Sequence, residues 1–85
     1  MSTIATGRTT EDLVRIALSG ASFWIKPTGR TTDDLVRIAA AMRQSGGQLT
    51  VLGTVGRTTE DLIRIGSAGK GHVTFAPSKA FFVED

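Results

Sequence analysis

The sequence predicts a small α/β domain in which about four short, mainly parallel strands alternate with three helices. One ten-residue block occurs three times in the 85 residues, as GRTTEDLVRI at 7–16, GRTTDDLVRI at 29–38 and GRTTEDLIRI at 56–65. Each block has the pattern of a helix start, and a short β-branched or aromatic segment follows it. Such a repeat indicates one supersecondary unit used three times, so we expect a single tandem βα-repeat domain of order β-α-β-α-β-α-β over residues 1–85.

Each block is predicted to start a helix at its two threonines. In the first block, Thr9 is the expected N-cap, and Asp12 lies three residues later, as in a shortened capping box. Leucine, isoleucine and alanine then follow at spacings of three and four residues, which predicts one buried stripe. Equivalent positions of the blocks are expected to be equivalent in the core, namely Leu13, Leu35 and Leu62, and Ile16, Ile38 and Ile65.

An acid and an arginine stand four residues apart within each block. This spacing predicts exposed ion pairs along each helix, each worth about 0.2–0.5 kcal/mol. The expected pairs are Glu11 with Arg15, Asp33 with Arg37, and Glu60 with Arg64.

Glycines predict where the three helices end. The first helix is expected to end near Ser19 and Gly20, and the second, which is the longest, near Gln44. The third is expected to stop before Gly66 or, at the latest, before Gly69. Apolar, β-branched or aromatic segments follow the helices, and a similar segment precedes the first block; the predicted strands are residues 1–5, 22–26, 48–52 and 72–76.

The predicted topology leaves one face of the sheet open. Strands joined through helices pair in parallel with right-handed crossovers, so strands in sequence order place all three helices on one face. Parallel sheets are normally covered on both faces, and a chain of 85 residues without cysteine has a thin core and no disulfide. We therefore expect a non-enzymatic interaction protein that forms a closed homo-oligomer, a dimer or a ring. The expected contacts are Trp24 on the open face and, in the apolar tail 78–85, Phe81, Phe82 and Val83.

The Gly-Arg-Thr-Thr turns support an alternative function. A glycine-bearing turn before a helix offers free backbone N–H groups and the positive end of the helix dipole to an anion. In a parallel sheet the three turns would line one edge, where their arginines could hold nucleic acid or another polyanion. The residues concerned are Gly7, Arg8, Thr9, Gly29, Arg30, Thr31, Gly56, Arg57 and Thr58.

Two carboxylates directly follow each turn and oppose this alternative. Glu11 and Asp12, for example, would repel an anion at the start of the first helix. A simpler interpretation is a ladder, in which Arg8, Arg30 and Arg57 pair with the acids of the next block. The net charge is +2, and charges of both signs alternate within each block, so the sequence shows no basic stripe of the kind that nucleic-acid binders carry.

No pattern in the chain indicates a catalytic site, a metal or a cofactor. His72 is the one histidine and there is no cysteine, so a structural zinc site lacks ligands. Trp24 has no second aromatic residue clearly placed on its strand face, so a base-stacking surface is not predicted. The N-terminal residues lack the pattern of a signal peptide, and no segment has the roughly 20 apolar residues that cross a bilayer. We expect a cytoplasmic protein without membrane contact.

Overall fold

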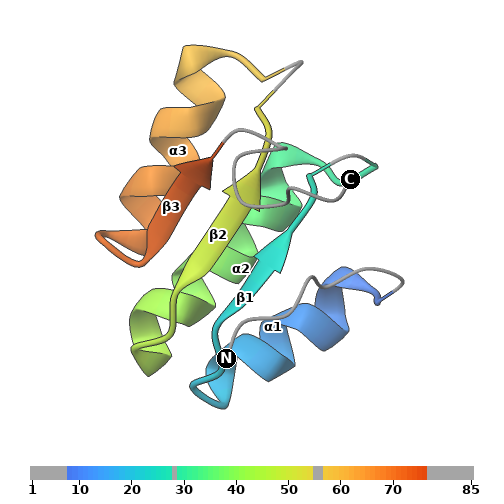
Figure 1. The fold of residues 1–85 in the computed structure, drawn as a ribbon, viewed down its shortest axis with the longest axis vertical. Coiled ribbons are helices and arrows are strands. Elements are labelled where there is room, and N and C mark those ends of the chain that lie inside the picture. Colours follow the sequence, from blue (N-terminus) through green and yellow to red (C-terminus); the bar gives the residue numbers. More distant parts are fainter. Residues whose placement is uncertain (1–7, 28, 55–56, 77–85) are drawn as a thin grey trace, which may run out of the picture.

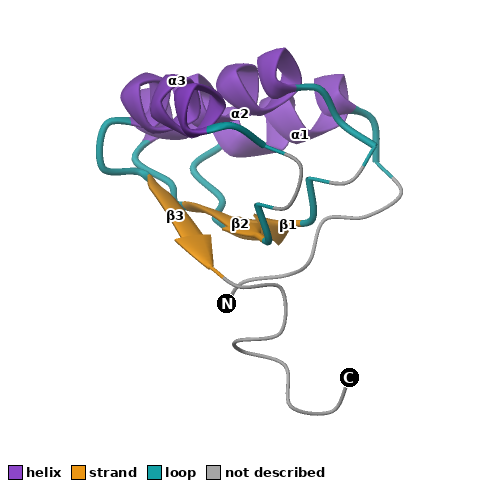
Figure 2. Cartoon of the chain, turned by 90° about the horizontal axis from the view of Figure 1, so that it is seen from above, coloured by secondary structure: helices purple, strands orange, loops and turns teal. Residues whose placement is uncertain are grey.

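Three helices alternate with three strands in the computed structural model, which describes residues 8–27, 29–54 and 57–76. The elements are α1 (Thr10–Leu18), β1 (Phe23–Ile25), α2 (Thr32–Ser45), β2 (Leu49–Leu52), α3 (Thr59–Gly69) and β3 (Val73–Ala76). The strands form one parallel sheet in the order β1-β2-β3. All three helices cover the same face of this sheet, with α2 between α1 and α3 (Figures 1 and 2). The predicted α/β class with parallel strands is therefore confirmed, whereas the strand predicted at residues 1–5 lies outside the described part.

Each helix starts at the threonine that the sequence predicts. The hydroxyl oxygen of Thr9 accepts a hydrogen bond from the backbone N–H of Asp12 at 3.1 Å. Thr31 and Thr58 make the same contact at α2 and α3, and there the aspartate side chain also accepts from the N–H of the capping threonine. These reciprocal bonds satisfy two backbone donors at the start of a helix, which is how a capping box stabilises it.

The helix ends follow the glycines, with one difference in α3. Gly46 ends α2 in the left-handed conformation with φ of 88°, where a residue without Cβ has no steric penalty. The third helix does not stop at Gly66 but continues to Gly69 and is closed by Lys70, whose φ is 42°. The observed end is one residue beyond the later of the two predicted ends.

The core lies between the helix layer and the sheet. Phe23 pairs with Leu49 in register, and Ile25 pairs with Val51; all four side chains are buried in one cluster with residues of the helices. Leu13, Leu35 and Ile65 contribute from the three helices and are completely buried. The alternate strand residue Trp24 is half-buried and lies in register with Thr50 and Thr74.

The predicted equivalence of the core positions is wrong at the two outer helices. Ile38 and Ile65 are completely buried, but Ile16 is 38% exposed. Conversely, Leu13 and Leu35 are completely buried, but Leu62 is only half-buried. The isoleucine of a block is buried where the helix of the preceding block lies beside it. The leucine of a block is buried where the helix of the following block lies beside it. Among the described residues α1 has no preceding helix and α3 has no following one, which explains both differences.

No helix within the described ranges has both the length and the apolar character needed to span a membrane.

Candidate interaction site

The arginines of the Gly-Arg-Thr-Thr turns reach back to the preceding block. The Nη1 atom of Arg30 donates to Thr10 Oγ1 at 2.9 Å, and its Nη2 atom donates to the carbonyl oxygen of Arg8 at 2.6 Å. Arg57 repeats the pattern one block later, donating to Thr32 Oγ1 at 2.8 Å and to the carbonyl oxygens of Pro27 and Arg30. The predicted ladder therefore has different partners, because hydroxyl and carbonyl oxygens of the preceding block take the place of acids of the next one.

A second set of arginines joins the helices on their exposed side. Arg37 of α2 lies 2.6 Å from the carboxylate of Glu11 in α1, and Arg64 of α3 lies 2.5 Å from that of Asp33 in α2. The prediction that each arginine pairs within its own helix is wrong for Arg37 and Arg64. The neighbouring helix is close enough for the long arginine side chain to reach its acid, so these ion pairs also connect consecutive blocks.

These contacts run in one direction and leave the first and last blocks incomplete. In the first block, neither Arg8 nor Arg15 has a side-chain partner among the described residues. In α3, the side chains of Thr59 and Glu60, which correspond to the acceptors Thr10 and Glu11, likewise have no partner within the described ranges. Donors are therefore unused at one end of the helix layer and acceptors at the other.

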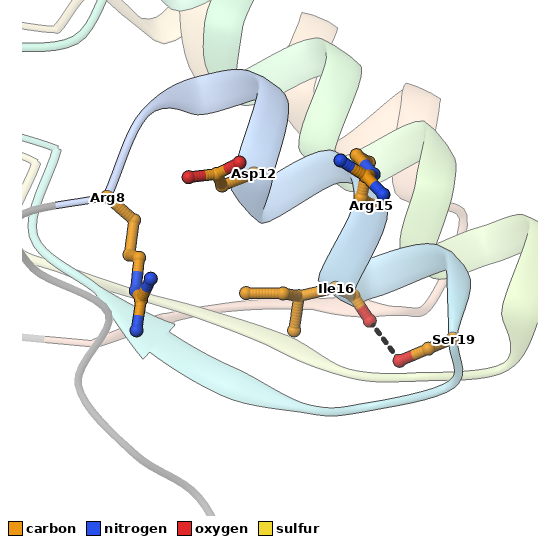
Figure 3. Close-up of a pocket in the computed structure, with 5 residues that line it drawn as sticks. All are labelled: Arg8, Asp12, Arg15, Ile16 and Ser19. Carbon is orange, nitrogen blue, oxygen red and sulfur yellow. Dashed lines mark hydrogen bonds between the residues drawn. The ribbon is translucent and has the colours of Figure 1, made fainter.

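A hollow of about 420 Å³ lies on the outer side of α1. It is lined by Arg8 from the segment before α1, by Asp12, Arg15 and Ile16 of α1, and by Ser19 at its end (Figure 3). In the second block the equivalents of Arg8 and Arg15 are Arg30 and Arg37, whose side chains contact the first block, and the equivalent of Ile16 is Ile38, which is completely buried. The hollow thus borders three residues whose equivalents in the second block are bonded to the first block or buried.

Only part of the predicted anion site lies within the described residues. Gly7 and Gly56 lie outside the described residues, and Gly29 has φ of 82°. The hydroxyl oxygens of Thr9, Thr31 and Thr58 cap their own helices, as described above. The guanidinium groups of Arg30 and Arg57 are already bonded within the chain, so Arg8 is the turn arginine with an unused side chain in the described part. Anion binding at these turns remains a prediction.

The other residues that the sequence singled out lie elsewhere. Trp24 is on the sheet, in a row with two threonines, and Phe81, Phe82 and Val83 lie outside the described residues. His72 is half-buried, and its Nδ1 atom is 2.8 Å from the carbonyl oxygen of Gly47, which joins the loop before β2 to the start of β3. No group of three or more histidine, aspartate or glutamate side chains in the described part of the chain could hold a metal ion.

Sequence reasoning did not find the outer residues Arg15, Ile16, Glu60 and Ile63 as candidate contacts. The repeat itself indicated these residues, because a repeated block that contacts its neighbours has a first and a last copy whose outer contacts are not made.

Comparison of the chain with protein-family models, with curated proteins and with solved structures gave no match.

Proposed function

We propose that the chain is a non-enzymatic interaction protein that functions as a homo-oligomer and is built from three near-identical βα units. The observation that carries this proposal is the exposure of large apolar side chains on both outer helices. Ile16 and Leu18 of α1 are 38% and 47% exposed, and Ile63 of α3 is 55% exposed. A small chain without disulfides gains much from covering such surface by association.

Polyanion binding through the turn arginines is the second candidate, and it receives support from Arg8 and Arg15 beside the hollow on α1. Asp12 lines the same hollow and opposes an anion there. Arg30 and Arg57, which the nucleic-acid hypothesis also needs, would have to give up hydrogen bonds within the chain to contact a phosphate. Self-association needs no such exchange, and we therefore place it first.

Sedimentation equilibrium over micromolar concentrations tests the proposal. We expect a mass of at least twice the 9.0 kDa of the chain. A monomer over the whole range would contradict self-association. Tight, salt-dependent binding of the chain to DNA or heparin near physiological salt would favour the polyanion candidate instead, since release of counterions makes such binding weaken steeply with salt.

A further inference from the structure

We propose that copies of this chain associate end to end, with α3 of one copy packed against α1 of the next as neighbouring helices pack within the chain. This inference rests on the proposed self-association and specifies its surface. The blocks are identical at eight of ten positions. Within the blocks, the outer side of α1 therefore carries nearly the same groups as the side of α2 that contacts α1, and the outer side of α3 nearly the same groups as the side of α2 that contacts α3.

The turn arginine supplies the first matching contact. Within the chain, Arg30 donates to Thr10 Oγ1 and to the carbonyl oxygen of the preceding turn arginine. In the end-to-end arrangement Arg8 would make these bonds to Thr59 Oγ1 and to the carbonyl oxygen of Arg57 in the adjacent copy. The burial of the threonines agrees with this, because Thr10 and Thr32 are half-buried whereas Thr59 is exposed.

The exposed ion pairs supply the second contact. Arg15 of one copy corresponds to Arg37 and Arg64, and Glu60 of the adjacent copy corresponds to Glu11 and Asp33. The arrangement would therefore add a third pair to the two that the chain forms by itself. Glu60 and Arg15 are both exposed and available for this.

The apolar side chains supply the third contact. Val14 and Val36 are half-buried against the core, while their equivalent in α3, Ile63, is 55% exposed. Ile38 and Ile65 are completely buried, while Ile16 borders the hollow on α1. Placing α3 of one copy in the hollow of another would cover Ile63 and Ile16 together.

Charge opposes symmetric contacts that are centred on these residues. A two-fold contact centred on Arg15 of two α1 helices would bring the two arginines together, and one centred on Glu60 of two α3 helices would bring the two glutamates together. Like charges placed together oppose association, whereas α3 against α1 pairs opposite charges. A contact between different surfaces of the same chain is heterologous, and it gives a ring if the rotation closes and a filament if it does not.

Two variants of the full chain test this arrangement, Ile16→Asp at the α1 end and Ile63→Asp at the α3 end. Each variant alone should associate at least about tenfold more weakly than the unchanged chain in sedimentation. An equimolar mixture should form a dimer of one copy of each, because every pair then has one intact α3 end and one intact α1 end. Circular dichroism of each variant checks that the helices are retained.

The other outcomes separate the possible failures. If both variants associate like the unchanged chain, the end-to-end contact is wrong and self-association stands through another surface, such as the open sheet face. If only one variant is weakened, the contact is symmetric through that helix, and the proposal is again wrong. A monomeric unchanged chain removes both proposals.

A second pair of variants avoids any change of apolar side chains. Arg15→Glu alone and Glu60→Arg alone should each weaken association. Mixing the two variants should restore association. The glutamate introduced on α1 of one variant can then pair with the arginine introduced on α3 of the other. Absence of rescue in folded variants would contradict the proposed pairing.

Discussion

The guanidinium of Arg37 in α2 lies 2.6 Å from the carboxylate of Glu11 in α1. Arg64 of α3 and Asp33 of α2 repeat this relationship at 2.5 Å. In both pairs the later block supplies the arginine and the earlier block supplies the acid. This fixed direction makes the two ends of the helix layer different, since within the described ranges one end has arginines without a partner and the other has acceptors without one.

The Glu11–Arg37 pair should contribute little to stability by itself. Its side chains are 71% and 48% exposed, and exposed pairs typically contribute about 0.2–1 kcal/mol. A double-mutant cycle with Glu11→Gln and Arg37→Gln, followed by urea unfolding, should give a coupling in this range. The control cycle with Glu11→Gln and Arg15→Gln should give less. A larger coupling in the control would mean that the pair within α1 prevails in solution.

Arg30 should matter much more than Arg8 for folding. Replacing Arg30 with Gln removes two hydrogen bonds from a charged donor, and the expected loss is about 1–3 kcal/mol. Each kcal/mol lowers the melting temperature of a domain of this size by roughly 4–8 °C. Arg8→Gln is the matched control, because that side chain has no partner among the described residues, and its effect in dilute solution should stay within about 0.5 kcal/mol. Equal losses for the two variants would contradict the observed ladder.

The isoleucine of the block should also matter more for stability in the second block than in the first. Ile38→Ala empties a completely buried site and should cost about 2–5 kcal/mol. The same change at Ile16, which is partly exposed on the outer side of α1, should cost about 1 kcal/mol or less in dilute solution. Thermal unfolding of the two variants checks this. A loss at Ile16 as large as that at Ile38 would show that α1 is covered within the monomer.

Replacement by alanine should destabilise the protein at one glycine of α3 and not at another. A Cβ at Gly69 would overlap with Cγ2 of Val73, so Gly69→Ala overpacks the contact with β3 and should cost about 1–3 kcal/mol. A Cβ at Gly66 would meet nothing within 4 Å, and alanine in a helix interior is favoured over glycine by about 0.5–1 kcal/mol. Gly66→Ala should therefore be neutral or stabilising in denaturant unfolding. Stabilisation by Gly69→Ala would rule out the close packing between α3 and β3.

Local signals in the sequence predicted the elements well. Thr9 and its equivalents cap the helices as expected, because a capping contact involves residues only three apart. The observed strands lie inside the predicted ranges 22–26, 48–52 and 72–76, since their short β-branched or aromatic segments are bounded by turn residues.

The partners of the arginines could not be predicted in the same way. Arg37 has an acid four residues earlier in its own helix and another 26 residues earlier in α1, and spacing alone favours the first. Which acid it meets depends on how closely and at what angle the helices pack. The exposure of Ile16 and Leu62 depends likewise on which helices lie at the ends of the layer. Nearly identical blocks do not indicate which helix has a neighbour on both sides.

Cysteine cross-linking tests the end-to-end contact most directly, because the natural chain has no cysteine. A chain with both Ile16→Cys and Ile63→Cys should, on mild oxidation, form disulfide-linked dimers, trimers and larger species that a reductant returns to monomers. The control carries Ile16→Cys with Ala40→Cys, since Ala40 is exposed on the central helix and lies at neither end. A ladder of products in the first variant and its absence in the control is the predicted result. Equal cross-linking in both, or none in either, would contradict the association of α3 with α1.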